Sequence, residues 1–225
     1  MNISGDKKEN KMAAVPERRR YDSLVRTAQA DETRRQIAGA ARRLFLARGW
    51  ARTTVRDVAR EAGVSVPTVY SAYGNKTGLA IALMDAADLA ADPDRLAADL
   101  AAAADPSGQL AVSVAFHRRL YERAGDVILL LREGGRTEPE LAAAYREGPR
   151  RGEEALLALF TSWPAGTFSD GVDPRSAVDI YGVICGIDAY TELTAGRGWS
   201  PDRVERWWTD LLSRELLRRP PRPTG

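Results

Sequence analysis

Apolar residues recur at helical spacing along most of this chain, beginning near residue 33. The pattern predicts a first helix over residues 33–48, with Thr33 and Gln36 spaced as a capping box and Gly49 at its end. Just beyond, Trp50 is placed to fold back over the apolar face of this helix. That face holds Ile37, Ala41, Leu44 and Phe45.

A second amphipathic stretch begins at Thr54. Its hydroxyl and the carboxylate of Asp57 have the spacing that satisfies free backbone N–H groups at a helix start. Gly63 is placed to end this helix, because glycine adopts the left-handed conformation without a Cβ penalty. The apolar positions between them are Val55, Val58, Ala59 and Ala62.

Another helix follows after a turn of a few residues. Ser65 or Val66 caps it, because Pro67 lacks an N–H and is tolerated only in a first turn. Asn75 is then the predicted cap of a helix that opens with Lys76. Two helices joined by a short turn with glycine fit the helix-turn-helix that reads DNA. The helix after Asn75 carries Leu79, Ala82, Leu83, Ala86 and Ala90 on one face.

The rest of the chain continues in alanine-rich stretches that prolines separate. No stretch alternates apolar and polar residues as a half-buried strand does, so the predicted fold class is all-α. The helices expected here span residues 93–104, 107–124, 126–134, 138–162, 174–195 and 201–218.

The run from Ala59 to Leu79 reads A-x-E-A-G-V-S-x-x-T-V-Y-x-x-Y-x-x-K-x-x-L. It resembles the N-terminal domain of the tetracycline-repressor (TetR) family of transcriptional regulators. Two departures are Pro67, where many members have glycine, and Tyr73, where phenylalanine is commoner. The resemblance covers residues 31–84, and its upstream part rests on Ile37, Ala41, Leu44, Phe45, Gly49, Trp50, Thr53 and Thr54.

This resemblance implies a homodimeric repressor that a small-molecule effector releases from a palindromic operator. It implies a three-helix helix-turn-helix DNA-binding domain followed by a larger helical ligand-binding and dimerisation domain. The alternatives are an activator, a regulator that responds to a protein partner, and a DNA-binding protein of another kind. The expected division is a disordered basic arm over 1–30, the DNA-binding domain over 31–80, the regulatory, effector-binding and dimerisation domain over 81–219, and a tail over 220–225.

The second helix of the motif would enter the major groove, where residues near its N-terminus reach base edges. None of them has the forked donors that read guanine, so readout would rely on hydroxyl groups and apolar contacts. The candidates for base contacts are Ser65, Val66, Pro67, Thr68, Ser71 and Ala72. Phosphate contacts are expected from Thr53, Thr54, Tyr70, Tyr73 and Lys76, and the resemblance places Arg34 near the DNA backbone. For Tyr73, packing between helices is the favoured alternative.

Charge is distributed unevenly, although the net charge is only +2. Residues 1–80 hold 16 Lys and Arg against 8 Asp and Glu, whereas residues 81–225 hold 17 against 23. A basic first third suits contact with a polyanion. It includes Arg18, Arg19 and Arg20, which either follow DNA phosphates or belong to a solvated tail; both interpretations stay open.

The two stretches nearest the C-terminus are apolar on more than one face, as expected of helices between a core and a partner subunit. Gly182 and Gly186, four residues apart, would permit close approach. The alternative is that both helices belong to the core of one subunit. The predicted dimer interface holds Tyr181, Ile184, Cys185, Trp207, Trp208 and Leu211.

An effector site in the larger domain needs polar groups set among apolar residues. His117, Tyr121 and Asp188 are the candidates, and the alternative for each is an ordinary satisfied or exposed polar residue.

Composition argues against several other classes. The only cysteine, Cys185, cannot form an intramolecular disulfide, and with only His117 beside it there is no ligand set for zinc. The sequence shows no nucleophile–base pair or phosphate loop, so no enzyme and no cofactor is expected. No apolar run approaches the ~18–20 residues of a membrane span, and no secretory signal is visible, so a cytoplasmic protein is expected.

Overall fold

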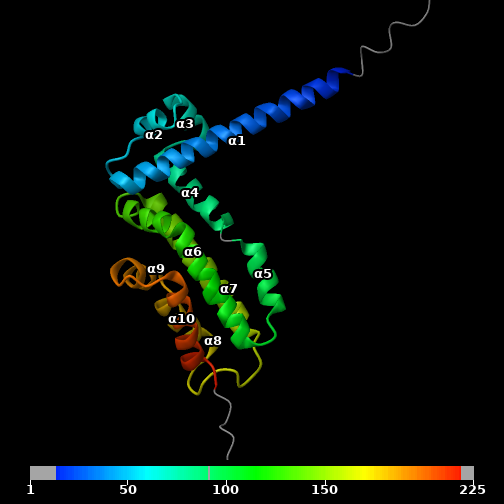
Figure 1. Cartoon of the computed structure of the whole chain (residues 1–225), viewed down its shortest axis with the longest axis vertical. Coiled ribbons are helices and arrows are strands. Elements are labelled where there is room, and N and C mark those ends of the chain that lie inside the picture. Colours follow the sequence, from blue (N-terminus) through cyan, green and yellow to red (C-terminus); the bar gives the residue numbers. More distant parts are fainter. Residues whose placement is uncertain (1–13, 91, 219–225) are drawn as a thin grey trace, which may run out of the picture.

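The computed structural model describes residues 14–90 and 92–218, which form helices joined by turns and short loops (Figure 1). No strand occurs among these residues, so the predicted all-α fold is confirmed. Nor does any helix within them have the length and apolar character that crossing a membrane requires. The elements are α1 (Ala14–Arg48), α2 (Val55–Glu61), α3 (Val66–Tyr73), α4 (Lys76–Ala90), α5 (Pro93–Ala102), α6 (Pro106–Gly134), α7 (Pro139–Thr161), α8 (Pro174–Ile184), α9 (Ile187–Thr191), the π-helix η1 (Glu192–Gly196) and α10 (Pro201–Leu216).

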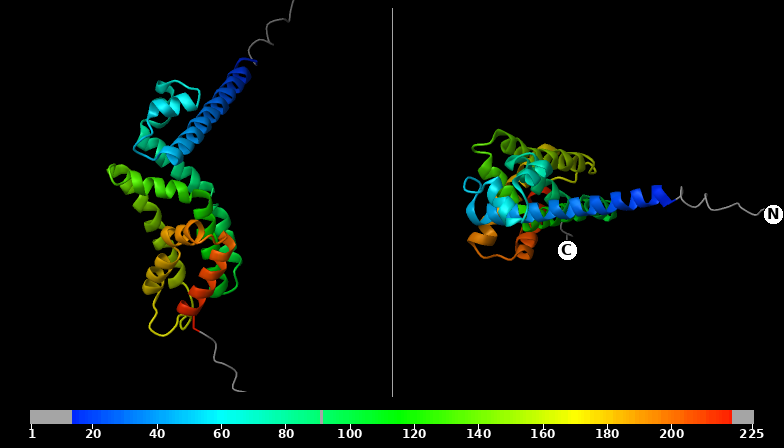
Figure 2. Two further views of the ribbon diagram at one scale, coloured as in Figure 1. Left: turned by 60° about the vertical axis from the view of Figure 1, so that its left-hand side comes forward. Right: turned by 90° about the horizontal axis from the view of Figure 1, so that it is seen from above.

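The helix-turn-helix lies at one end of the molecule (Figures 1 and 2). Here α2 and α4 pack against α1, and α3 packs on both α2 and α4. The ring of Trp50 folds back onto Phe45, with the ring centroids 5.3 Å apart, as the sequence predicts. The buried side chains of α1 to α4 and the loop after α1 include Ile37, Ala41, Phe45, Trp50, Val58, Val69 and Leu79.

The core at this end continues into the larger part of the molecule. Val127 and Leu131 of α6 and Leu141 of α7 are buried in the same cluster as the residues of α1 to α4. The boundary predicted between residues 80 and 81 falls inside α4, a helix that packs on both α1 and α6. The DNA-reading end and the larger part therefore share one apolar core.

A second core fills the opposite end, between α6, α7, α8, α9 and α10. The residues that α10 buries recur every four positions, so one stripe of this helix faces inward. Large aromatic side chains dominate the interior, among them Phe160, Tyr181 and Trp208.

The first helix is longer than the hydrophobic pattern predicts, because it begins at Ala14. The predicted disordered arm is thus wrong for residues 14–30, whereas residues 1–13 lie outside the described residues. Alanine and arginine, which are common in residues 14–30, favour a helix even where no apolar face can be buried. The N-terminal half of α1 projects away from the rest of the molecule (Figure 1).

The predicted capping box at Thr33 is wrong for the same reason. Thr33 lies inside α1, and its hydroxyl donates to the carbonyl oxygen of Gln29, 2.9 Å away. The Gln36 side chain donates to Glu32 rather than to a helix end.

Two helix boundaries of the larger part also differ from the prediction. The stretches 107–124 and 126–134 form the single helix α6, in which Gly125 is buried. A Cβ atom on Gly125 would lie 3.3 Å from Ile187 Cδ1, so this glycine serves the packing of α9 on α6. The stretch 174–195 is divided into α8, α9 and η1, because the chain leaves helical geometry at Cys185 and Gly186.

Candidate nucleic-acid interface

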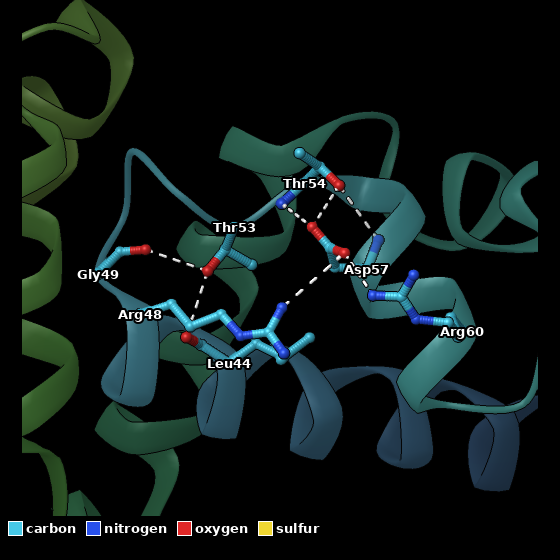
Figure 3. A network of polar contacts seen from close by, with 7 residues as sticks. All are labelled: Leu44, Arg48, Gly49, Thr53, Thr54, Asp57 and Arg60. Atoms are coloured by element: carbon cyan, nitrogen blue, oxygen red, sulfur yellow. Dashed lines mark hydrogen bonds and ion pairs between the residues drawn. The ribbon is translucent and has the colours of Figure 1, made fainter.

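A reciprocal cap holds the start of α2 (Figure 3). Thr54 Oγ1 accepts the backbone N–H of Asp57, and the Asp57 carboxylate accepts the backbone N–H of Thr54, both at 3.1 Å. The Arg60 guanidinium donates to the same carboxylate at 2.6 Å. The hydrogen bonds from Thr54, and then the charge of Arg60, lower the pKa of Asp57. The predicted cap is confirmed, and it fixes the point where the chain enters α2.

The turn between α2 and α3 has the predicted form. Gly63 follows the C-cap Ala62 with φ +67°, a left-handed conformation that favours glycine. Of the two caps left open for α3, the structure selects Ser65, whose Oγ accepts the backbone N–H of Thr68 at 3.2 Å. The next helix is capped as predicted, since Asn75 Oδ1 accepts the backbone N–H of Gly78 at 2.6 Å.

The helix α3 has an inner and an outer face. Val69 is buried, and Val66 packs partly against the first core. On the outer face, the side chain of Tyr70 is 50% exposed. The other exposed residues predicted to contact DNA from this segment are Ser65, Pro67 and Ser71, whereas Thr68 is half-buried. This face is therefore open to a partner.

The prediction that Thr53 contacts phosphate is wrong. Its side chain is 1% exposed, and its hydroxyl donates to the carbonyl oxygens of Gly49 (3.0 Å) and Leu44 (3.2 Å) (Figure 3). Thr53 thus ties the loop after α1 to the end of α1. The neighbouring Thr54 is exposed and remains a candidate for phosphate contact.

Two further predicted phosphate contacts are engaged inside the protein. The Tyr73 hydroxyl donates to the carbonyl oxygen of Arg34 at 2.9 Å, which agrees with packing between helices, and burial raises the pKa of Tyr73. Lys76 Nζ donates to the carbonyl oxygen of Trp50 at 2.5 Å and lies 3.9 Å from the centre of the Trp50 ring. Desolvation lowers the pKa of Lys76, although the charge of Glu138 opposes this effect. Lys76 therefore holds the loop at Trp50 and does not point freely at phosphate.

Two exposed arginines lie on the helices α1 and α2 of the same end. Arg34 is exposed on α1 and remains a candidate for contact with the DNA backbone. Arg56, which the sequence analysis did not single out, is exposed in the first turn of α2. The sequence could have identified Arg56 as a candidate for phosphate contact, because it follows the predicted cap Thr54 by two residues and so lies in the first turn of the predicted helix.

The structure divides the predicted dimer-interface residues. Tyr181, Cys185 and Trp208 are at most 2% exposed and lie in the second core, so their prediction as interface residues is wrong. The physical reason is that Tyr181 of α8, its C-cap Cys185 and Trp208 of α10 lie on the sides of these helices that pack inside the second core. Trp207 is 38% exposed, and Val183, which belongs to the same apolar stretch as Tyr181 and Ile184, is 80% exposed. Ile184 and Leu211 are half-buried.

The predicted effector residues are also divided. His117 and Tyr121 lie at the second core with their ring centroids 5.9 Å apart, and His117 Nδ1 lies 2.9 Å from the Tyr181 hydroxyl and 3.1 Å from the Ser113 carbonyl oxygen. Burial lowers the pKa of His117, against the opposing effect of the Ser113 carbonyl. Asp188 is exposed and forms an ion pair with Arg132, so the structure does not bring it to the other two.

The helix α3 has an exposed outer face and follows the short helix α2 across a turn with glycine, at the basic end of the chain. This arrangement defines the class of helix-turn-helix DNA-binding proteins. Residues 37–83 match the family model described as bacterial regulatory proteins, tetR family. The helix-turn-helix segment of this chain is thus similar to that family.

Curated proteins match the same segment. The chain is 49% identical over 57 residues to the HTH-type transcriptional regulator TtgR of Pseudomonas putida, which covers 25% of this chain and 27% of TtgR. It is 45% identical over 47 residues to the HTH-type transcriptional regulator AlkX of Mycobacterium tuberculosis, covering 21% and 22%. The chain thus matches about a quarter of the length of these relatives.

Solved structures share the fold over most of the chain. A protein from Saccharomonospora viridis, described as a transcriptional regulator and crystallised with choline, superposes with TM-score 0.69 and 24% identity, covering 84% of this chain and all of that one. NalD of Pseudomonas aeruginosa, the secondary repressor of the MexAB-OprM multidrug efflux pump, gives TM-score 0.67 and 23% identity, covering 88% and 100%. At these identities the likeness establishes the fold.

Proposed function

We propose that the protein is a cytoplasmic, homodimeric repressor that binds a palindromic operator and leaves it when a small molecule binds in the larger helical part. The observation that carries the proposal is the outer face of α3, where Tyr70 and Ser71 are exposed while Val69 anchors the opposite face. A helix held in this way can enter a major groove without exposing its core. The relatives named as transcriptional regulators, and the repressor NalD, support this proposal.

Base reading would come from the outer face of α3 through Ser65, Ser71 and the ring of Pro67. Val66 and Thr68 are half-buried and would contribute less. Hydroxyl groups and apolar atoms discriminate bases less strongly than bidentate arginine or asparagine contacts do. Specificity would therefore require two copies of the site.

Phosphate contacts would fix the position of α3 in the groove. Arg34 and Arg56 supply positive charge, and the exposed hydroxyls of Thr54 and Tyr70 supply hydrogen bonds. These contacts carry no base information and would act equally on every sequence.

Dimerisation would bring two copies of α3 to the same side of a duplex, about one helical turn (~34 Å) apart or somewhat more. The exposed side chains of Val183 on α8 and Trp207 on α10 are apolar and suit the centre of such an interface. The half-buried Ile184 and Leu211 belong to the same two helices and would widen it.

A ligand in the larger part can alter DNA binding only if its affinity differs between two arrangements of the α3 helices. Arg42 of α1 donates two hydrogen bonds to the carboxylate of Asp126 on α6, at 2.8 and 2.9 Å, and a third to the Arg123 carbonyl oxygen. A shift of α6 would thus carry α1 with it.

Selection of binding sites from random duplexes at about 0.15 M salt tests the proposal, because non-specific electrostatic binding is reduced there. We expect an enriched palindrome. The Ser71→Ala variant should change the preferred base at one position of each half-site, whereas Ser107→Ala, in the first turn of α6 and far along the chain from the motif, should return the parent sequence. General salt-sensitive binding without enrichment would contradict an operator-binding role.

A further inference from the structure

Aromatic rings from four helices meet inside the second core. His117 and Tyr121 come from α6, Tyr181 from α8, Tyr190 from α9 and Trp208 from α10. The ring of Tyr121 is central, with centroid distances of 5.9 Å to His117, 5.6 Å to Tyr190 and 6.4 Å to Trp208. These five residues are called the aromatic cluster below.

One fully buried polar atom of the aromatic cluster has no hydrogen-bond partner among the residues that the structure describes. The side chain of Trp208 is completely buried, and its Nε1 finds no hydrogen-bond acceptor there. A buried donor left unsatisfied costs about 1–3 kcal/mol, and most buried polar groups in native proteins are paired. The indole of Trp163, in the same core, donates to Gln109 Oε1 at 2.6 Å. The Trp208 N–H is thus a donor available to a bound molecule.

The aromatic cluster carries no net charge near neutral pH. Burial lowers the pKa of His117 and raises the pKa of Tyr121 and Tyr181, so these groups stay neutral. On the neighbouring positions of α6 and α10, ion pairs join Arg118 to Glu205 and Glu122, so the charge of this arginine is taken up by carboxylates outside the aromatic cluster. A neutral molecule would therefore enter at a lower desolvation cost than an ion.

The covering elements on one side of the aromatic cluster are short. The chain breaks between α8 and α9, and α9 has five residues before it passes into the π-helix η1. Such π segments are frequent at functional sites. Tyr190 belongs to α9 and its ring packs against those of Tyr121 and Trp208, so α9 is the element that would have to move for a molecule to reach these two rings.

We propose that the aromatic cluster is a binding site for a neutral, flat aromatic molecule with one hydrogen-bond acceptor, which Trp208 Nε1 binds. The rings supply stacking surfaces, and the unused N–H supplies direction. The inference rests on the proposed function in one respect, namely that the bound molecule acts as the effector.

A matched pair of probes isolates the hydrogen bond. 2-Acetylnaphthalene carries a carbonyl oxygen where 2-ethylnaphthalene carries a methylene group. Equilibrium dialysis of the full-length protein gives the dissociation constants of the two probes. The ratio of these constants in the parent protein is then compared with the ratio in each variant. We expect Trp208→Phe to reduce the relative preference for 2-acetylnaphthalene by roughly 3- to 10-fold, the range of a net hydrogen bond. Trp199→Phe, at a half-buried ring that Arg203 covers, should leave the ratio unchanged.

The outcomes separate this site from the proposed function. A ratio that Trp208→Phe does not change, or 2-naphthoate binding as tightly as 2-acetylnaphthalene, would overturn the site. Operator selection that succeeds while neither neutral naphthalene binds would overturn it as well and leave the DNA-binding role intact. If the ratio changes as expected but no palindrome is enriched, the site stands and the repressor proposal fails.

Discussion

Trp163 and Trp208 are buried in the same core but differ in one hydrogen bond. The Trp163 indole is satisfied by Gln109, whereas the Trp208 indole has no acceptor within the part of the chain that the structure describes. At the scale of single residues, stability depends on whether each buried polar atom is paired. The two side chains therefore form a natural comparison.

Replacing each tryptophan by phenylalanine should have unequal effects. Both variants lose ring volume, but Trp163→Phe also leaves Gln109 Oε1 without its donor, while Trp208→Phe removes an unsatisfied N–H. We expect Trp163→Phe to lower the free energy of unfolding by about 1 kcal/mol more than Trp208→Phe. Urea titration of both variants measures the difference, and equal losses would contradict the assignment of these hydrogen bonds.

His117 gives the protein a pH dependence of known sign. Its pKa is lowered by burial, so below the unfolded value of about 6.5 the unfolded chain takes up a proton that the folded protein does not. Stability should therefore be complete above that pH and fall by at most about 1.4 kcal/mol per pH unit until the folded pKa is reached. Urea titrations from about pH 7.5 to about pH 5.5 should show this loss in the parent protein and a smaller one in His117→Asn. Parallel curves would show that His117 is not the titrating group.

At the scale of helices, α1 is the element whose extent sequence reasoning underestimates. An amphipathic pattern reveals only the part of a helix that packs, and the N-terminal half of α1 projects beyond the body (Figure 1). Under the proposed DNA-binding role, such a helix would bring further basic residues toward the phosphates.

Deletion of residues 1–20 tests whether the basic end of α1 reaches DNA. If Arg18, Arg19 and Arg20 engage the duplex, affinity for the selected operator should fall. The slope of log K against log salt should also decrease by about 0.9 for each phosphate that these arginines neutralise in the parent complex. Deletion of residues 1–13 is the matched control, since it keeps all three arginines. Identical slopes for the two deletions would reject the interaction.

Local signals predicted the helix-turn-helix well, because caps and turns depend on residues a few positions apart. Thr54 with Asp57, the left-handed Gly63 and the cap Asn75 all have their predicted roles. Thr53 and Lys76 could not be assigned in this way, since their partners are backbone carbonyls that packing brings near. For the same reason a wide apolar stripe could not distinguish the buried Trp208 from an interface residue.

For the whole molecule, the interactions between its two ends matter most. The bidentate ion pair of Arg42 with Asp126 joins α1 to α6. The sequence does not reveal this pair, because the two residues lie 84 positions apart. Arg43 and Glu61 also form an arginine–carboxylate ion pair, at 3.3 Å, but within the helix-turn-helix end. Their side chains are more exposed than those of Arg42 and Asp126.

Double-mutant cycles with alanine should distinguish the two pairs. We expect a coupling energy of about 1 kcal/mol for Arg42 and Asp126, because the bond is bidentate and partly shielded, and near zero for Arg43 and Glu61. Urea titration of the single and double variants at low salt provides the values. Similar coupling in both cycles would mean that the bridge between α1 and α6 is an ordinary surface pair.

The apolar core shared by α4, α6 and α7 limits how this protein can be recombined. A fragment cut near residue 80 would leave behind Val127, Leu131 and Leu141, on which the DNA-reading helices pack. Fusing those helices to the regulatory domain of another protein would therefore carry over the apolar surface that packs on α6 and α7, together with the recognition surface. A chimera that preserves this packing should behave as one cooperative body, whereas one that ignores it would expose apolar surface on both sides of the joint.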